Sequence, residues 1–316
     1  MHSLNDYKKI IDNFPRVRVA VIGDIVADIY IYGKPFKLSR EAPVIVVRYE
    51  GENIVPGSAG NTANNLAKLG AKVYPIGIVG DDEPGRYLRD YFTREGVDTQ
   101  GIFISKERGT ISKTRLLAGD TYASKRQVVR IDKEPSWKPS PAMEEKILNH
   151  MDQINGPVDA WIVSDYGYDI ITPRVLEKIR KLTKEKFVVA DSRYRICDFV
   201  GASIVTPNES EAEAATGIPI RKEGDLVEVG KRLLEKINSQ AVIITRGNQG
   251  MMLFERTGRV ESIPICGPNE VTDVTGAGDT VTGLLALGVP AGADLLQAVR
   301  LSNYAAGVVV MKNGTA

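Results

Sequence analysis

The sequence predicts a doubly wound α/β fold on a mainly parallel sheet, and three observations carry that prediction. Strand-length runs of Val and Ile alternate with segments of helical periodicity through most of the 316 residues. These apolar runs are continuous rather than alternating, which is typical of strands covered on both faces. Two β-rich segments without a helical period predict a smaller sheet inserted into this body.

The predicted elements follow one another in a regular order. Six apolar runs are expected to form buried strands, at residues 17–23, 73–80, 160–164, 187–191, 202–207 and 241–245. Between them apolar residues recur at helical spacing, as Ala63, Leu66 and Ala67 do in the first helix. The expected helices cover residues 61–69, 84–95, 140–154, 172–184, 208–216 and 225–237.

Residues 29–56 and 109–131 interrupt this alternation. Both segments are rich in β-branched and aromatic residues and carry turn signals. We expect them to form a small β-sheet that acts as a lid, with an edge extension of no functional role as the alternative. The segment KEPSWKPSP at 133–141 is expected to be a surface loop. Residues 1–316 are then expected to form a single domain with the two lid segments inserted in it.

The composition argues against several classes of protein. The net charge is +1, from 41 basic and 40 acidic residues, so no broad electrostatic contact with nucleic acid or membrane is expected. With only His2 and His150, a histidine zinc site or a Ser-His-Asp triad is not expected. Cys197 and Cys266 have no metal-binding spacing, and the N-terminus does not resemble a signal peptide. We therefore expect a cytoplasmic protein.

The strongest chemical signal is the stretch DVTGAGDTVTGLLALG at 273–288. Gly276, Ala277 and Gly278 directly precede an apolar helical pattern, so a glycine loop is expected at a helix N-terminus. Backbone N–H groups without intrahelical partners and the helix dipole favour negative charge there. Because a phosphoryl group in transfer carries charge on its oxygens, this loop can serve as an anion hole.

Asp279 falls in the first turn of that helix. Its carboxylate can accept the proton of an attacking hydroxyl, which typically accelerates a reaction about 100- to 10,000-fold. The alternative is that Asp279 only stabilises the helix N-terminus, by about 0.3–1 kcal/mol. The P-loop, G-x-G-x-x-G and protein-kinase motifs are absent from the sequence, so these nucleotide-binding classes are not expected.

From about residue 17 onward, the chain resembles the ribokinase-like (PfkB) carbohydrate kinases. It carries four of their motifs in order: PGSAGNTANNLAKLG at 56–70, N-x-x-E at 208–211, T-x-G-x-x-G at 245–250 and D-x-x-G-A-G-D at 273–279. Ser58 stands where the family usually has a second glycine. The resemblance implies a ribokinase-like fold and an ATP-dependent sugar kinase that uses ATP and Mg²⁺.

The resemblance also implies roles for single residues on the ATP side. Asp279 is the expected catalytic base, with Gly276, Ala277 and Gly278 as the anion hole. Asn208 and Glu211 are expected to organise Mg²⁺ through water, as suits a cation that keeps several waters. The remaining expectations are a nucleotide site at Thr245, Gly247, Gly250 and Asn303, and a monovalent cation such as K⁺ near Asp273 and Thr275.

The sugar side is expected at the carboxyl end of the first strand. Asp24 lies there, at the edge where open α/β sheets usually bind ligands, and it can accept two hydroxyl hydrogen bonds. Gly57 allows close backbone approach, and Asn61 can both donate and accept. Asn61 as a helix N-cap is the alternative. Asp28 either helps Asp24 or faces solvent.

Within the family the chain resembles the heptose-7-phosphate kinase half of bifunctional ADP-heptose synthases. GDIVADIYIYG at 23–33, SREAPVIVV at 39–47 and QVVRIDKE at 127–134 carry this likeness. It implies phosphorylation of O1 of D-glycero-D-manno-heptose 7-phosphate. A kinase for fructose, ribose, a nucleoside or another sugar phosphate is the alternative, and a non-catalytic sugar- or nucleotide-binding protein is a remote one.

A phosphorylated sugar needs cations in its binding site. Lys113, Arg115, Arg130 and Arg193 are the candidates, with solvated lid charges as the alternative. Where the subgroup usually reads D-Y-x-K-G and D-P-K, this chain has DYGYD at 165–169 and DSR at 191–193, so one lysine is absent and another is replaced. The expected partners are a sugar or sugar phosphate, ATP, and a second copy that meets the apolar face of the lid. The chain stops just after the kinase pattern, so we expect a stand-alone kinase or a shortened chain.

Overall fold

The computed structural model describes residues 3–119, 125–266 and 275–311. In this part of the chain, one sheet has the strand order β13 (Val260–Ile263), β12 (Met251–Glu255), β11 (Ala241–Thr245), β10 (Ile204–Val205), β9 (Phe187–Ser192), β8 (Ala160–Asp165), β1 (Arg18–Gly23), β4 (Lys72–Gly80) and β5 (Ile102–Ser105). Strands β11 to β5 run parallel, whereas β12 and β13 pair antiparallel. The mainly parallel α/β prediction is confirmed.

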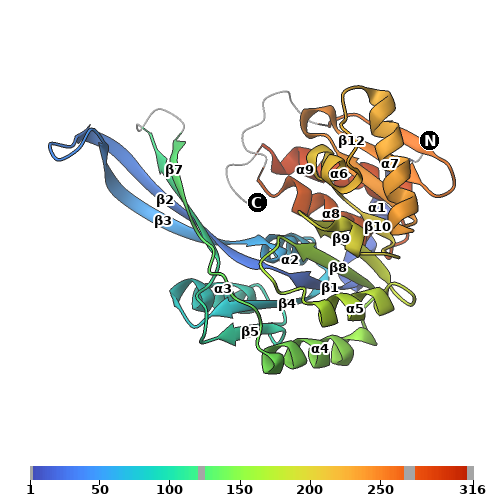
Figure 1. Ribbon diagram of the computed structural model, residues 1–316, viewed down its shortest axis with the longest axis horizontal. Helices are drawn as coiled ribbons and strands as arrows, with labels where there is room; N and C mark the ends of the chain where they lie inside the picture. The colour runs from blue at the N-terminus through green and yellow to red at the C-terminus, as the bar shows by residue number, and fades with distance from the viewer. Residues whose placement is uncertain (1–2, 120–124, 267–274, 312–316) are drawn as a thin grey trace.

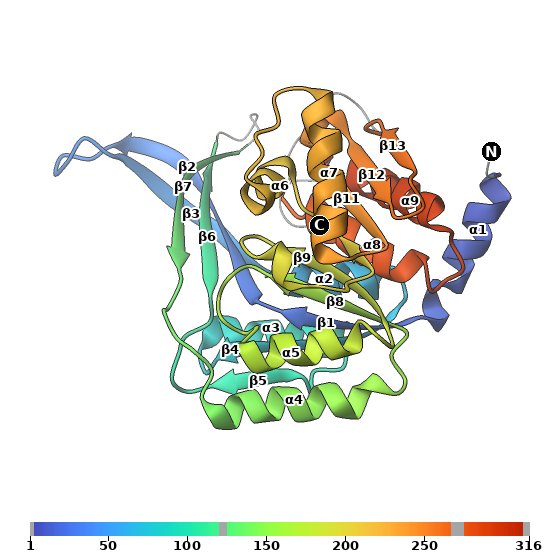
Figure 2. The same ribbon diagram turned by 45° about the vertical axis from the view of Figure 1, so that its right-hand side comes forward.

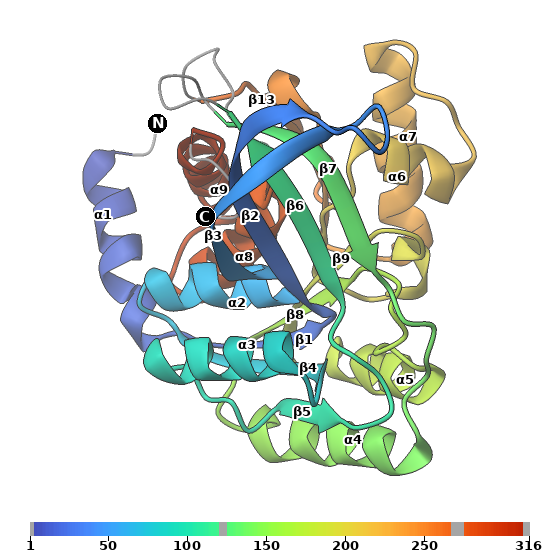
Figure 3. The same ribbon diagram turned by 90° about the vertical axis from the view of Figure 1, so that its left-hand side faces the viewer.

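Helices cover both faces of this main sheet (Figures 2 and 3). Packed on one face are α1 (Leu4–Asn13), α2 (Ala59–Lys68), α3 (Glu83–Arg94), α8 (Ala277–Gly288) and α9 (Leu295–Val309). Packed on the other are α4 (Pro141–Asn155), α5 (Pro173–Leu182), α6 (Glu209–Thr216) and α7 (Glu223–Ile237). Because side chains alternate along a strand, Val19 and Val21 of β1 enter one core, while Ala20 and Ile22 enter the other.

Helix α8 is the most enclosed helix of the first layer. Every residue from Asp279 to Gly288 is buried, as expected for a helix that is apolar all round. The helix packs against α2, α9, β8 and β9. Its N-terminus, and therefore Asp279, is held within the molecule by all four elements.

A second sheet, here called the lid sheet, has the order β3 (Ile45–Ser58), β2 (Ile25–Leu38), β6 (Ser112–Ala118) and β7 (Arg126–Lys133). Strand β2 pairs antiparallel with β3 and parallel with β6, and β6 pairs antiparallel with β7. The far ends of β2 and β3 project away from the body (Figure 1). The sheet is built from the two predicted β-rich segments, although residues 120–124 lie outside the described residues.

The lid strands β2 and β3 extend further toward the main sheet than predicted. Pairing of β2 with β3 begins at Ile25 and Ser58, next to Asp24 and the start of α2. Strands β5 and β13, at the two edges of the sheet, and β12 beside β13 were not predicted; each is only four or five residues long. The loop predicted between β7 and α4 is present.

Two further observations concern the described residues as a whole. Cys197 and Cys266 are both free thiols. Among the described helices, none combines the length and apolar character needed to cross a bilayer.

Candidate active site

Two carboxylates from distant parts of the chain are connected at the carboxyl edge of the main sheet. Asp24 follows β1, and Asp279 lies in the first turn of α8. The loop after β8 contacts both, because the backbone N–H of Tyr166 donates to Asp24 Oδ2 at 2.9 Å and its hydroxyl donates to Asp279 Oδ1 at 2.9 Å. The strand order thus places the predicted sugar carboxylate and the predicted base in one site.

Asp279 is buried and held by two donors. Besides Tyr166, Asn61 Nδ2 donates to Asp279 Oδ2 at 2.8 Å. Burial raises the pKa of Asp279 to about 6, while the hydrogen bonds from Asn61 and Tyr166 lower it. The side chain is therefore ionised at neutral pH yet more basic than an exposed aspartate, which suits a general base.

The glycine loop opens α8 as the sequence predicts. Gly276 is the N-cap and has a left-handed backbone, with φ 82°, which glycine adopts without strain. A Cβ placed on Gly278 would meet no atom within 4 Å, so the space in front of this turn is open. The first N–H groups of α8 have no intrahelical acceptor, and an anion can bind them. Asp273, predicted to help hold a monovalent cation, lies outside the described residues; Thr275 lies within them.

Asp24 is almost fully buried beside the same loop. Its Oδ2 accepts hydrogen bonds from the backbone N–H groups of Tyr166 and Tyr168, at 2.9 and 3.2 Å. Its Oδ1 is buried and has no donor among the described residues. Burial raises the pKa of Asp24 to about 6. A hydroxyl group could donate a hydrogen bond to this oxygen.

The structure specifies the contacts of three residues that were predicted to lie near Asp24. Asn61 is not the N-cap of α2, which is Ser58; instead it contacts the predicted base. Asp28 does not face solvent, because it is buried and paired with Arg115 at 2.5 Å. A Cβ on Gly57 would lie 2.4 Å from Asp28 Oδ2. The space left by Gly57 therefore admits the Asp28 carboxylate.

A cavity of about 730 Å³, here called the α8–α9 cavity, lies in front of the glycine loop. Seven predicted residues line it: Asn208, Thr245, Gly247, Gly250, Ala277, Gly278 and Asn303. Asn303 donates from Nδ2 to the Pro264 carbonyl at 2.8 Å, which fixes one wall. Sequence reasoning missed the apolar part of the lining: Met251, Ile265, Ala306, Gly307 and Val310. Apolar walls with a few polar groups are typical of a nucleotide-base pocket.

Asn208 and Glu211 form a capping box at the start of α6. The Glu211 backbone N–H donates to Asn208 Oδ1, and the Asn208 N–H donates to Glu211 Oε2, both at 2.9 Å. Burial raises the pKa of Glu211. The two side chains therefore cap the N-terminus of α6, which is a structural role.

Asp191, at the end of β9, was missed by sequence reasoning. Its pKa is raised well above the usual value by burial and by the nearby charges of Glu211, Asp279 and Asp165. The hydrogen bonds that Ser192 and Arg195 donate nearby go to Asp165 instead. Among these residues no three His, Cys, Asp or Glu side chains are close enough to bind a metal directly. The carboxylates of Glu211 and Asp191 suit a cation such as Mg²⁺, which takes few protein ligands and keeps several waters.

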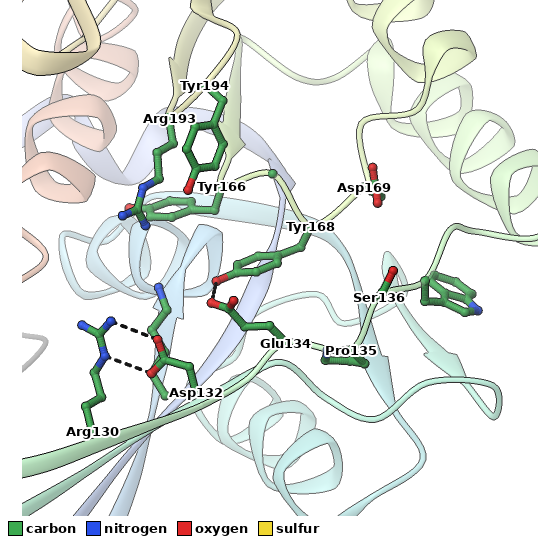
Figure 4. A pocket seen from close by; sticks show the side chains of 13 residues that line it. Arg130, Asp132, Glu134, Pro135, Ser136, Tyr166, Tyr168, Asp169, Arg193 and Tyr194 are labelled. Atoms are coloured by element: carbon green, nitrogen blue, oxygen red, sulfur yellow. Dashed lines mark hydrogen bonds and ion pairs between the residues drawn. The ribbon is translucent and has the colours of Figure 1, made fainter. Parts of the chain in front are cut away.

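A second cavity, of about 550 Å³ and here called the lid cavity, lies between the lid sheet and the loops after β8 and β9 (Figure 4). Three predicted cations line it, and they are Lys113, Arg130 and Arg193. Arg130 is paired with Asp132, through two contacts of 2.9 Å. In Figure 4 the hydroxyl of Tyr168 points to Glu134, to which it is hydrogen-bonded. Arg115, the fourth predicted cation, is instead buried against Asp28.

Comparisons with known proteins identify the family to which the sequence belongs. A model of the pfkB family carbohydrate kinases matches residues 17–316. The bifunctional protein HldE of Geobacter sulfurreducens is 40% identical over 302 residues, covering 95% of this chain and 60% of that protein. HldE of Pelobacter propionicus is 39% identical over 316 residues, covering 98% and 64%. The chain thus spans less than two thirds of the length of these curated relatives.

Solved structures show the same fold at low sequence identity. Ribokinase of Arabidopsis thaliana complexed with ribose and ATP has a TM-score of 0.72 at 20% identity, covering 94% of this chain and 93% of that one. Phosphofructokinase-2 of Escherichia coli, in complex with substrates and products, has a TM-score of 0.75 at 15% identity, covering 93% and 92%. The fold is ribokinase-like, and the chain belongs to the pfkB family of carbohydrate kinases.

Proposed function

We propose that this kinase phosphorylates O1 of D-glycero-D-manno-heptose 7-phosphate, with Asp279 as the catalytic base. The observation that carries the proposal is the lid cavity. Tyr166, which donates to Asp279, lines it, as do Lys113 and Arg193, neither of which forms an ion pair with a carboxylate among the described residues. The sequence resemblance to heptose-7-phosphate kinase domains and the HldE relatives support this choice of sugar.

The sugar hydroxyls would bind at the floor of the site. Three buried polar atoms have no hydrogen-bond partner among the described residues there: Asp24 Oδ1, Asn61 Oδ1 and Ser164 Oγ. A buried polar atom without a partner is destabilising by about 1–3 kcal/mol. Several sugar hydroxyls bound together would satisfy these atoms, and this supports Asp24 and Asn61 as the sugar-binding pair.

The sugar phosphate would bind between Lys113 of the lid sheet and Arg193 of the loop after β9. The other two candidate cations are already paired, Arg115 with Asp28 and Arg130 with Asp132. Burial lowers the pKa of Lys113, the nearby Asp28 raises it, and the charge of Arg193 lowers it again. An anion held between the two cations would relieve that repulsion, with Arg193 able to bind it in a bidentate manner.

ATP would occupy the α8–α9 cavity, with its base between α9 and Gly250 and its γ-phosphate at the Gly276–Gly278 turn. Asp191 and Glu211 would hold Mg²⁺ through water, and that ion would neutralise charge on the phosphates. Near Thr275, we propose a monovalent cation site. Escherichia coli phosphofructokinase-2, a structural neighbour, has been solved in complex with potassium.

The reaction follows from this arrangement. The acceptor hydroxyl transfers its proton to Asp279, its oxygen forms a bond to the γ-phosphorus, and the bond from that phosphorus to the bridging oxygen of ADP breaks. The N–H groups at the start of α8 stabilise the charge on the phosphoryl oxygens. Closure of the lid sheet would exclude water, which otherwise competes as the acceptor.

A second candidate is a kinase of the same family for an unphosphorylated sugar. The lid cavity also contains the carboxylates of Asp132, Glu134 and Asp169, which repel a phosphate and can accept hydroxyl hydrogen bonds instead. Tyr168 stands where the heptose subgroup usually has a lysine. The choice between the two candidates depends on which charges in this cavity face the ligand.

An ADP-release screen over sugars and sugar phosphates tests the proposal. We expect turnover with heptose 7-phosphate and none with unphosphorylated hexoses or pentoses. Lys113→Gln and Arg193→Gln should each raise the KM for the sugar phosphate at least about tenfold, which corresponds to the loss of one charge-assisted contact. Arg130→Gln is the matched control and should change this KM less, because Arg130 is already paired with Asp132. Response to unphosphorylated sugars alone would contradict the heptose-phosphate assignment.

A further inference from the structure

One residue, Tyr166, connects the two carboxylates of the site. Its backbone N–H donates to Asp24 Oδ2 at 2.9 Å, and its hydroxyl donates to Asp279 Oδ1 at 2.9 Å. Neither contact was predicted from the sequence, in which Tyr166 is one of 12 tyrosines. Because the two carboxylates are proposed to bind the sugar and to take its proton, the position of this one residue affects both.

The Asp279 carboxylate receives one donor on each oxygen. Tyr166 donates to Oδ1, and Asn61 Nδ2 donates to Oδ2 at 2.8 Å. The last torsion of an aspartate side chain is intrinsically broad, so one donor alone leaves the carboxylate free to rotate. Two donors on opposite oxygens fix its plane. Each oxygen still has a lone pair with which to accept the attacking hydroxyl.

Tyr166 is itself held from several sides. Asp165, the preceding residue, is buried and accepts from Arg195 Nε at 2.9 Å. Gly167 adopts φ 86°, and a Cβ there would lie 2.9 Å from the ring of Tyr194. The ammonium of Lys113 lies 5.5 Å from the centroid of the Tyr166 ring. These contacts restrict the loop that carries Tyr166 on both sides of the residue and on its ring face.

Buried Arg108 supports the other end of the same loop. It donates from Nη1 to the Tyr168 carbonyl at 3.4 Å and from Nη2 to the Ile78 carbonyl at 3.1 Å. Its guanidinium lies 5.1 Å from the ring of Trp137. Contacts to β4 and to the loop before α4 therefore limit how far the Tyr166–Tyr168 loop can move.

We propose that Tyr166 is a positioning residue of the phosphoryl transfer, whose hydroxyl aligns Asp279 with the attacking hydroxyl of the sugar. This inference rests on the role proposed above for Asp279. The proton of the sugar hydroxyl passes to Asp279, the new O–P bond forms and ADP leaves, while Tyr166 keeps its own proton throughout. Tyr166 does not exchange protons with the substrate, and it acts only through the base.

The electrostatic setting of Asp279 makes this role measurable as a pH effect. Donors to it come from α2, where Asn61 and Thr62 lie, and from Tyr166, while Asp28 of β2 and Asp191 of β9 are the nearby charges. Burial raises the pKa of Asp279 most, the hydrogen bonds from Asn61, Tyr166 and Thr62 lower it, and the charge of Asp28 raises it. Burial and the charge of Asp279 raise the pKa of Tyr166 well above its usual value, so it remains a neutral donor across the working range.

Tyr166→Phe tests the inference. We expect kcat to fall about 10- to 100-fold with little change in the KM for ATP, and the acid limb of the kcat–pH profile to move up by about one pH unit, because one donor to the anion is lost. Tyr91→Phe is the matched control, since it removes a hydroxyl that donates to Asn64, outside the site, rather than to Asp279. Its acid limb should coincide with that of the unaltered protein. An unmoved acid limb in Tyr166→Phe, or equal shifts in both variants, would overturn the inference.

Two further variants keep the test decisive. Adding Tyr166→Phe to Asp279→Asn should cause no additional loss of turnover, and an additive loss would show that Tyr166 acts independently of the base. If Tyr166→Phe does not fold, 3-fluorotyrosine at position 166 is a stronger donor and should move the acid limb to lower pH; an unmoved limb would again overturn the inference. Normal turnover in Asp279→Asn alone would instead contradict the proposed base, so the two failures are distinguishable.

Discussion

At the residue scale, the same burial that makes Asp279 a base also destabilises the fold. Its pKa rises from 3.8 to about 6 because the charged form is removed from water. Below about pH 4 the carboxyl is neutral in both the folded and the unfolded chain. As the pH rises through 6, the folded state must hold a buried charge, and stability is lost. The Asp279 carboxylate therefore lowers the free energy of unfolding at the pH where it is catalytically useful.

Asp279→Asn should consequently stabilise the protein in a pH-dependent way. The gain in unfolding free energy should be about 2 kcal/mol larger at pH 7.5 than at pH 4.5, because an amide carries no charge at either pH. An asparagine can keep both contacts, accepting from Asn61 and donating to the Tyr166 oxygen. Urea unfolding at the two pH values measures this difference. A gain in unfolding free energy that does not change with pH would contradict the conclusion that the ionised Asp279 carboxylate is buried.

Sequence reasoning at this scale found the residues but not their contacts. Asp24, Asn61 and Asp279 were identified from motifs, whereas the hydrogen bond from Asn61 to Asp279 joins residues 218 positions apart. Tyr166 and Asp191 fall in the stretches compared with the subgroup motifs, at 165–169 and 191–193, but the resemblance assigned neither of them a role. Both sit at the carboxyl ends of parallel strands, which is the one signal that would have selected them.

At the element scale, the junction between β3 and α2 contains a strained residue. Ser58 has φ 54° and ψ −127°, a conformation that L-residues rarely adopt, and its side chain makes no capping hydrogen bond. Strain of this kind amounts to about 1–3 kcal/mol. The backbone at this position thus explains the glycine that the family usually has here, and the sequence motif alone does not specify that backbone geometry.

Ser58→Gly should stabilise the protein. Relief of the strain exceeds the extra entropy that glycine gives the unfolded chain, which is about 0.5–1 kcal/mol, so we expect a net gain of about 1 kcal/mol. Chemical denaturation measures it, with Ser58→Ala as the control because alanine retains the Cβ. Equal stability of the Gly and Ala variants would argue against strain as the cause.

At the scale of the whole molecule, the lid sheet exposes apolar side chains on strands far from the core. Leu38, Ile45, Val128 and Ile131 are between 54% and 69% exposed. Apolar groups gathered on one exposed sheet are typical of an interaction surface. We propose that a second copy of the chain covers them and that the protein is a homodimer through the lid sheet.

Sedimentation at micromolar concentration tests the dimer. The unaltered protein should sediment as a dimer, and Ile131→Glu should sediment as a monomer, because a charge would be buried at the interface. Val200→Glu is the control: Val200 is 42% exposed but lies outside the lid sheet. A monomeric unaltered protein, or dissociation by both variants, would contradict the assignment.

The overall architecture was the most predictable feature and the lid cavity the least. Continuous apolar runs alternating with helical periods are enough to predict a parallel sheet with helices on both faces. The pair of Asp28 with Arg115 depends on strand register, which relates the two across 87 residues and which the sequence pattern does not give. Arg130 is paired with Asp132 on the same strand, so two of the four predicted cations were already paired.

Turnover by Asp279→Asn tests the central claim most directly. The rate of phosphoryl transfer from ATP to the sugar phosphate, measured by rapid quench, should fall by about 100- to 10,000-fold. The reason is that the proton acceptor is lost while the shape of the site is kept. The dissociation constant for ATP, measured by calorimetry, should change less than about threefold. A variant that retains turnover within about tenfold of the unaltered protein would show that Asp279 is not the base.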